Sequence, residues 1–356
     1  MDTVPEFLKN KAPKTRRNYL WILKEFFKEM DKQPETYLQN KKTYDYRPDI
    51  KNWWEKHLDE VPKTRHTKLG VIKSYLEFYE IVYPKSFWIE RRREKKGRRA
   101  ATLDRVPTQH EFKTLLMHGD VKDKALFLFL ATSGMRIDEV LHLKLSMINF
   151  KRDPPLITIP GSISKTGDPR ITFITQETKG YLEEWIKIRK SYITTAISKT
   201  KHLCDKKEED DKLFPFTYDV AWRGWLRLLK QAGYDDRDST TGRYIIHIHC
   251  LRKFFMSQMK LEVPTVIPEA LAGHEEYLDE AYRRFTQEQL GEYYKKAENR
   301  LTIMESLPDL SSINQQLEDV VHENIGLKQR VEILEGMINK KGNEALNLLK
   351  EKEKKI

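Results

Sequence analysis

Apolar residues recur at helical spacing through the first ninety residues of the chain. Steps of three and four positions place the side chains of each run on one face of a helix. The two clearest runs are Tyr19, Ile22, Leu23, Phe26 and Phe27, and Leu69, Ile72, Leu76 and Tyr79. This pattern predicts a small helical domain over residues 1–90.

A charged segment without apolar periodicity follows this domain. Residues 91–99 read RRREKKGRR, which is too polar to contribute to a core. Because such a run stays solvated, we interpret residues 91–104 as a basic linker that could track a DNA groove.

Several helices are predicted after the linker. Thr108 with a Glu three positions later is typical of a capping box at the start of a helix. The apolar run 125–130 predicts a second helix, which should end at Gly134. A third helix is expected to begin at Arg136 and to reach Leu145.

Extended structure is predicted next. The β-rich runs 156–159 and 170–174 are separated by Gly, Ser, Lys and Asp-Pro, a composition that predicts a hairpin with Lys165 in its loop. Helical patterns then continue to about Ile303. We therefore expect residues 105–305 to form a mainly α domain with a small antiparallel β-sheet.

A different pattern begins at Ile313, where apolar positions follow a seven-residue repeat. The repeat predicts a coiled coil over residues 309–350, in which Asn324 is the polar core position that favours a parallel dimer. A helix that folds back on its own domain is the alternative. The core positions are Leu317, Val320, Asn324, Leu327, Val331, Leu334 and Ile338.

Length and composition agree with two folded domains. The chain has 356 residues, of which 39% are apolar, as in ordinary water-soluble proteins. No stretch approaches the roughly 18 uncharged apolar residues of a membrane helix, and Cys204 and Cys250 are too few for a disulfide framework. We therefore expect a cytoplasmic protein with no membrane association.

The net charge of +11 is concentrated near the N-terminus. Residues 1–100 hold 25 Lys and Arg against 15 Asp and Glu, whereas the rest of the chain is nearly balanced. Such a basic end can neutralise phosphates along a duplex, although it is also compatible with a merely soluble surface. Segments 14–17 and 63–68 combine Lys and Arg with Thr hydroxyls, and we expect both to face one DNA duplex.

A set of reactive residue types follows in the second domain. They suit phosphodiester transfer without an energy source, in which a tyrosine forms a covalent phosphoryl intermediate that conserves the bond energy. Two arginines would stabilise the phosphorane, a hairpin lysine would protonate the leaving 5′ oxygen, and a histidine would accept the tyrosine proton. The segments are, in order, 132–140 (TSGMRIDEV), Lys165, 249–252 (HCLR), 271–274 (LAGH) and Tyr282.

In these segments the chain resembles the tyrosine recombinases, and the phage-integrase type in particular. The likeness covers about residues 105–303, and residues 281–285 (AYRRF) are most similar to archaeal members. The first domain resembles the family's core-DNA-binding domain more loosely. The resemblance implies a two-domain DNA clamp that cuts and rejoins double-stranded DNA in site-specific strand exchange for a mobile element.

The resemblance also implies roles in binding the phosphate. Arg136 and Arg252 would form the phosphate-binding pair, and His274 would donate a hydrogen bond to the phosphate. Glu139 stands where the family places an acidic residue that braces the first site.

Three further matches concern proton transfer and the covalent bond. Lys165 would be the leaving-group acid, His249 the proton acceptor, and Tyr282 the nucleophile of a 3′-phosphotyrosyl intermediate. Tyr282 lies eight residues after His274, whereas many family members have nine. The other tyrosines nearby are Tyr277, Tyr293 and Tyr294.

The resemblance implies no metal or nucleotide cofactor, and it implies a homo-oligomer on DNA, from dimer to tetramer. The coiled coil would contribute to this self-association. Each reactive residue also has an ordinary interpretation, such as a surface arginine, a loop lysine or a core tyrosine. Their order along the chain is what favours catalysis.

Three other functions remain open. The chain could be a catalytically inactive DNA-binding protein, or a topoisomerase-like enzyme of the same chemistry that relaxes supercoils. It could also be a zinc protein, although no CxxC pair supports this. The zinc ligands would be Cys204, His247, His249 and Cys250.

Overall fold

The structure is a computed structural model, and it describes residues 3–39, 41–93, 103–199, 210–274 and 285–304, with Leu327 and Arg330. The chain divides into two compact units, of which the first comprises Met1–Arg105 and Gly233–His247. The second comprises Val106–Ala232 and Ile248–Ile356. The core positions of the predicted coiled coil other than Leu327 lie outside the described residues, and so does Tyr282.

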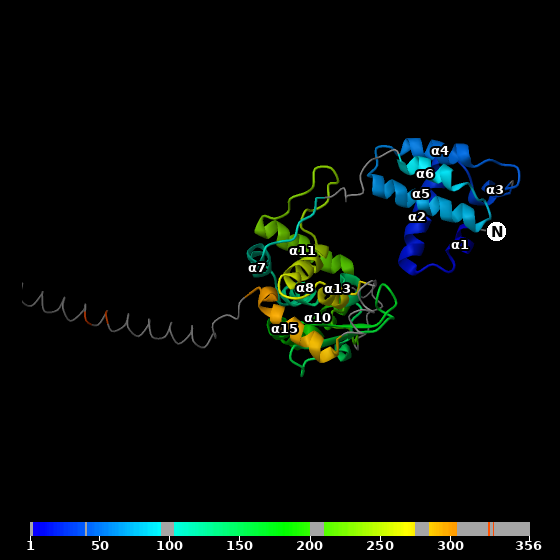
Figure 1. Cartoon of the computed structure of the whole chain (residues 1–356). Coiled ribbons are helices and arrows are strands. Elements are labelled where there is room, and N and C mark those ends of the chain that lie inside the picture. Colours follow the sequence, from blue (N-terminus) through cyan, green and yellow to red (C-terminus); the bar gives the residue numbers. More distant parts are fainter. Residues whose placement is uncertain are drawn as a thin grey trace, which may run out of the picture. The chain divides into compact units, whose positions relative to one another are not determined.

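The described part of the first unit is mainly helical (Figure 1). Proline at the first or second position of α2, α3, α4 and α5 favours these helix starts, because its missing N–H would be unpaired there anyway. The helices predicted from the two apolar runs are confirmed as α2 and α5. The helices are α1 (Thr3–Leu8), α2 (Pro13–Glu29), α3 (Pro34–Tyr37), α4 (Arg47–Lys56), α5 (Pro62–Phe78) and α6 (Lys85–Arg93).

The core of this unit lies between α2 and α5. Leu23 and Phe26 on α2, and Ile72 and Leu76 on α5, are each 0% exposed. Burial of each such side chain stabilises the fold by roughly 1.5–3 kcal/mol. The apolar runs of the sequence are therefore core positions.

Helix α5 corrects part of the expected DNA-facing surface. Arg65 and Lys68 belong to a segment expected to contact DNA, yet they are only 0% and 3% exposed. Lys68 Nζ lies 2.6 Å from Glu25 Oε2 and 2.6 Å from Glu60 Oε1. The Arg65 guanidinium lies 4.1 Å from the centroid of the Trp54 ring. Both cations share the helix face that carries the core, which turns them away from solvent.

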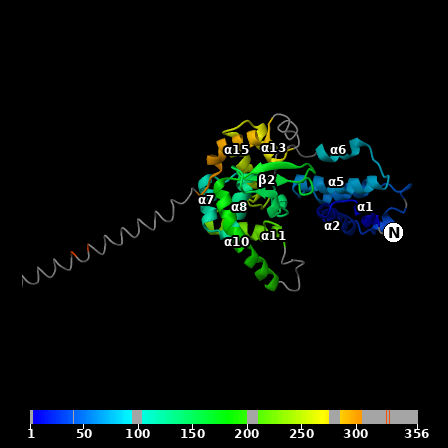
Figure 2. The same ribbon diagram turned by 90° about the horizontal axis from the view of Figure 1, so that it is seen from below.

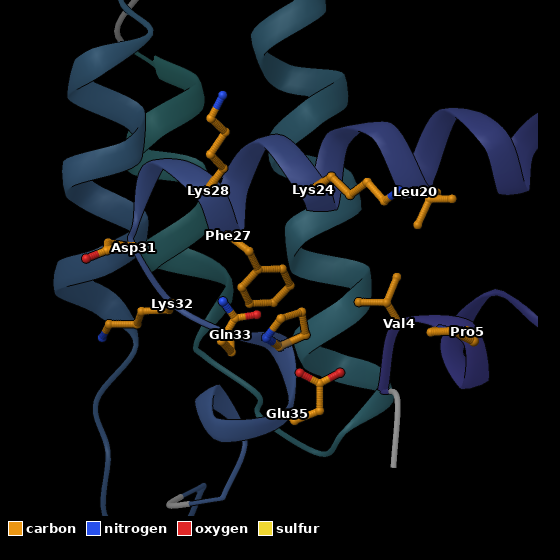
Figure 3. Close-up of a pocket in the computed structure, with 11 residues that line it drawn as sticks. Val4, Pro5, Leu20, Lys24, Phe27, Lys28, Asp31, Lys32, Gln33 and Glu35 are labelled. Atoms are coloured by element: carbon orange, nitrogen blue, oxygen red, sulfur yellow. The ribbon is translucent and has the colours of Figure 1, made fainter.

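The other expected basic side chains remain exposed. They are Lys14, Arg16 and Arg17 on the first turn of α2, and Lys63 on the first turn of α5. A hollow also opens beside α2, and Figure 3 shows Val4, Leu20 and Phe27 among its lining residues. None of the residues expected to react lines this hollow.

The second unit is mainly helical with a small antiparallel sheet, as predicted. None of the helices in the described ranges is long and apolar enough to cross a membrane. The helices of the second unit are α7 (Gln109–Met117), α8 (Val121–Ser133), α9 (Ile137–Val140), the 3-10 helix η1 (Leu145–Met147), α10 (Gln176–Lys199), α11 (Tyr218–Ala232), α12 (His249–Lys260), α13 (Val266–Ala272) and α15 (Gln287–Leu301).

Three strands form the sheet in the order β1 (Ile148–Asn149), β2 (Leu156–Ile159) and β3 (Arg170–Phe173). The predicted hairpin is confirmed, with Ile159 opposite Arg170 across the β2–β3 ladder. Strand β1 was not predicted, because two residues are too few to form an alternating pattern. Every residue of β3 is buried, and both α8 and α13 contact it (Figure 2).

The helix starts and ends follow local chemistry. Thr108 and Glu111 form the predicted capping box of α7. Helix α8 ends where Gly134 adopts a left-handed conformation with a φ of 65°. A Cβ atom at Gly134 would lie 2.3 Å from the Phe255 ring, so glycine permits the close approach of α12.

The helix expected between Arg136 and Leu145 is shorter than predicted. Helix α9 covers only Ile137–Val140, and the chain beyond it pairs with a distant segment. Leu213 N donates to Leu143 O at 2.8 Å, and Leu145 N donates to Asp211 O at 3.1 Å. These tertiary hydrogen bonds replace the helical ones that the apolar spacing favours.

Candidate active site

Arg252 is buried on α12, with 5% of its surface exposed. Its Nη1 donates a hydrogen bond to Gly134 O at 2.6 Å and a second one to Ala272 O. Its Nη2 is buried and has no hydrogen-bond partner among the described residues. A buried guanidinium with an unmade hydrogen bond is costly, and an anion would satisfy it.

Like charges surround this guanidinium. Burial, followed by the positive charges of Arg136 and Arg170, lowers the pKa of Arg252 to about 9. Glu139 and Glu269 oppose this shift without cancelling it. Three arginines thus lie near two carboxylates, an arrangement that favours a negatively charged ligand.

Arg136 precedes α9 and is braced by Glu139. Its backbone N–H donates to Glu139 Oε2 at 3.0 Å, and its Nη1 donates to Glu139 Oε1 at 3.2 Å. The side chain of Arg136 is 22% exposed. The helix terminus itself offers no anion site, because α9 has four residues and Glu139 takes this N–H. The guanidinium is thus the group of Arg136 that is left to interact with an anion.

Lys165 lies in the β2–β3 loop, and its side chain is exposed. Its backbone N–H lies 3.4 Å from Glu139 Oε1, so one carboxylate contacts both Arg136 and the loop. The structure thereby places the Lys165 backbone next to Glu139, the carboxylate that binds Arg136.

Arg170 is a site residue that the sequence analysis missed. Its side chain is 1% exposed, and its Nη2 lies 2.5 Å from Glu139 Oε2. Burial raises the pKa of Glu139, but the hydrogen bonds and charges of Arg170 and Arg136 together outweigh it and lower the pKa overall. The only sequence signal was a charged residue at the first position of β3, whose partner strand β2 is apolar at three of its four positions.

His274 follows α13 and is held by a second acid. Its Nδ1 is hydrogen bonded to Glu269, which also accepts from Lys260 Nζ. The His274 side chain is 43% exposed. With Nδ1 engaged, Nε2 is the ring atom that could reach a substrate. Glu269 was not identified from the sequence, because its contact with His274 depends on the turn at Gly273.

His249 is the first residue of α12 and is exposed. It precedes Arg252 by three positions, so both side chains lie on one face of the helix. Tyr294 is 0% exposed, and its hydroxyl donates to Thr132 O at 2.9 Å. Burial also raises the pKa of Tyr294 well above its usual value. Because its hydroxyl is enclosed and bonded to Thr132, Tyr294 is not an accessible nucleophile in this structure.

A cluster of possible metal ligands lies in the first unit and consists of Glu25, His57 and Glu60. The ammonium group of Lys68 lies between the two carboxylates and supplies the charge that a metal ion would supply. Of the residues considered for zinc, Cys204 lies outside the described ranges, and His247 Nε2 lies 3.0 Å from Asp104 Oδ2.

Most of the second unit matches a known protein family. The sequence profile of the phage integrase family matches residues 106–288, which is about half of the chain. The chain belongs to the phage integrase family. It is therefore a tyrosine recombinase, an enzyme that cuts and rejoins DNA at specific sites.

Relatives within the phage integrase family are distant. The tyrosine recombinase XerA of Saccharolobus solfataricus is 26% identical over 247 residues, which cover 67% of this chain and 71% of XerA. The structure of lambda integrase residues 75–356 bound to DNA is 14% identical with a TM-score of 0.52, covering 80% of this chain and 97% of that one. A lambda integrase tetramer bound to a Holliday junction is 14% identical with a TM-score of 0.51, covering 82% and 75%. These structural likenesses show an integrase-like fold.

Proposed function

We propose that Arg136 and Arg252 bind the two non-bridging oxygens of the scissile phosphate. The observation that carries this assignment is the buried Arg252 Nη2, which lacks a hydrogen-bond partner among the described residues. A phosphate oxygen would accept from it in a charge-assisted hydrogen bond, and the bond would strengthen as charge builds up in the phosphorane. Arg136 is braced for the same task by Glu139. His274 would donate from Nε2 to the same phosphate.

Proton transfer is assigned to two exposed side chains. Lys165 would protonate the leaving 5′ oxygen from the β2–β3 loop, and its backbone contact with Glu139 supports a position near the phosphate. His249 would accept the proton of the nucleophile, which its place on the Arg252 face of α12 supports. No residue in this scheme requires a metal or nucleotide cofactor.

Tyr282 is proposed as the nucleophile that forms a 3′-phosphotyrosyl bond and releases a free 5′ hydroxyl. Two facts support it: Tyr282 follows the His274 segment in the chain, and Tyr294 is buried away from solvent. The bond energy of the phosphodiester is kept in the tyrosyl ester, so rejoining needs no further energy source.

A nicked suicide substrate tests this assignment, because loss of the fragment beyond the nick traps the covalent complex. Tyr282→Phe should bind DNA like the parent and form no covalent complex. Tyr294→Phe is the matched control and should still form it. After nuclease digestion, mass spectrometry should find the nucleotide adduct on Tyr282. An adduct on Tyr277 or Tyr293 would refute the assignment.

The remaining organisation is also part of the proposal. Residues 1–90 would form a DNA-binding domain joined by the basic linker 91–104 to the catalytic domain 105–305, acting in the cytoplasm. The exposed cations on the first turns of α2 and α5 support the DNA-binding role. Assembly on DNA as a dimer to tetramer is suggested by the tetrameric lambda integrase complex. The heptad repeat over residues 309–350 would add a parallel coiled coil.

A further inference from the structure

Arg170 opens strand β3 and has no role in the scheme above. It is buried in the second unit, where the whole residue is 3% exposed. Its Nη2 lies 2.5 Å from Glu139 Oε2, its Nη1 donates to Glu139 Oε1 at 3.3 Å, and its Nε donates to Leu271 O at 3.3 Å. Arg170 therefore holds Glu139 through two parallel hydrogen bonds and reaches the end of α13 with the third donor.

Glu139 joins the segments that carry the reactive groups. Besides Arg170, its carboxylate accepts from the backbone and guanidinium of Arg136, and it lies 3.4 Å from the backbone N of Lys165. The Glu139 side chain is only 2% exposed. Without Arg170 this carboxylate would lose two of its hydrogen bonds and would present a less compensated negative charge near the phosphate.

The backbone around α13 is shaped to admit Arg170. Gly273 adopts a left-handed conformation with a φ of 81° directly before His274. A Cβ atom at Gly273 would lie 2.7 Å from Arg170 Nε. Glycine thus provides both the turn and the space, and Arg170 contacts the carbonyl of Leu271 two positions earlier. The Arg170 guanidinium consequently connects Glu139 with the segment that leads into His274.

We propose that Arg170 is a positioning residue of the recombinase: it orients the Glu139 carboxylate, which in turn aims the Arg136 guanidinium at the scissile phosphate. The inference rests on the proposed function of Arg136. It places Arg170 outside direct contact with the substrate. Loss of Arg170 should therefore slow the chemical step and leave DNA affinity nearly unchanged.

A double-mutant cycle tests the route through Glu139. Single-turnover cleavage would be measured for the parent, Arg170→Met, Glu139→Met and the double variant, with the exposed Arg223→Met on α11 as control. We expect Arg170→Met to cleave about a hundredfold more slowly, since a misplaced catalytic group costs about this factor. The double variant should be no slower than the Glu139→Met variant. Losses that multiply would show that Arg170 acts independently, and a parental rate for Arg170→Met would overturn the proposal.

The double variant also guards against failure to fold. Arg170→Met leaves a buried carboxylate without its partner, whereas the Met–Met pair is apolar and of similar volume. If the single variant does not fold, Glu139→Met and the double variant still give the comparison. Equal cleavage rates of Glu139→Met and the double variant support the proposal. A double variant that cleaves tenfold more slowly than Glu139→Met, or slower still, contradicts it.

A second substrate separates positioning from a general structural defect. In a methylphosphonate, a methyl group replaces one non-bridging oxygen of the scissile phosphate and removes its negative charge. A poorly aimed arginine then matters less, so the deficit of Arg170→Met, or of the double variant, should shrink to about threefold. An equal deficit on both substrates would indicate a merely structural role. If the parent itself formed no covalent complex on the unmodified phosphate substrate, the proposed function would fail instead.

Discussion

Lys68 and Arg252 are both buried cations, yet the protein treats them in opposite ways. Lys68, in the first unit, lies 2.6 Å from carboxylate oxygens of Glu25 and Glu60. Arg252, in the second unit, bonds only to backbone carbonyls and leaves Nη2 without a partner among the described residues. The fold thus pairs the lysine charge with carboxylates, whereas it leaves one nitrogen of the arginine without an acceptor.

The pKa shifts express the same difference. Burial lowers the pKa of Lys68, but the hydrogen bonds and charges of Glu25 and Glu60 outweigh it and raise the pKa overall. Burial of Arg252 is reinforced by like charges, so its pKa falls. Burial of a cation is therefore not in itself a sign of function. A buried cation that lacks a hydrogen-bond acceptor and has like charges beside it, as Arg252 does, is a candidate ligand site.

The largest expected effect is on catalysis by Arg252. Arg252→Gln removes donors to the developing phosphorane charge, so single-turnover cleavage should slow by about a hundredfold or more. The exposed Arg223→Gln on α11 is the matched control and should cleave at the parental rate. Both variants should bind DNA, because we expect other cations, such as those at the start of α2, to contact it as well. Unimpaired cleavage by Arg252→Gln would show that Arg252 has no catalytic role, and that its contrast with Lys68 is not one of function.

The next effect is on stability and concerns Lys68. Lys68→Met leaves Glu25 and Glu60 uncompensated, and it should lower the free energy of unfolding by about 2–4 kcal/mol, less than for fully buried pairs since both acids are partly exposed. Urea unfolding would measure it, with the exposed Lys63→Met as control. Cleavage per folded molecule should stay parental. A stability equal to the parent's would show that the pair is not structural.

The pH dependence of this stabilisation has a definite sign. The pKa of Lys68 is raised above 10.5 in the folded state. Its contribution is therefore complete below the unfolded value and declines only as the pH rises through the higher folded value. The difference in unfolding free energy between the parent and Lys68→Met should be constant from neutral pH to about pH 10.

The smallest effect concerns the exposed cations of α2. If Lys14 and Arg17 each neutralise one phosphate, the double variant Lys14→Gln/Arg17→Gln should reduce the slope of log affinity against log salt by about 1.8. Lys68→Met, measured at a temperature where it is folded, should leave the slope unchanged, because Lys68 already pairs with Glu25 and Glu60. A salt titration of DNA binding gives both values. An unchanged slope in the double variant would remove α2 from the DNA interface.

Local patterns predicted most of the elements that carry the site. The capping box at Thr108, the end of α8 at Gly134 and the β2–β3 hairpin follow from side-chain chemistry within a few residues. Local spacing also placed His249 and Arg252 on one helix face. These features depend on neighbours in sequence, so they can be read without the tertiary structure.

Other features were decided by residues far apart in the chain. Helix α9 ends early because Leu143 pairs with Leu213, and Lys68 turned out to be structural because Glu25 approaches it from another helix. The same holds for the Arg170–Glu139 pair, whose members are 31 positions apart. No local pattern records which charges a fold will neutralise.

By itself, the amino-acid sequence determined the helical character of the chain, the hairpin, the order of the reactive residues and the family that they indicate. Only the tertiary structure decided which basic residues are balanced and which are left with unmet hydrogen bonds. The reason is physical: periodicity and capping act over a few residues, whereas the charge balance of a buried group is set by every element that packs around it.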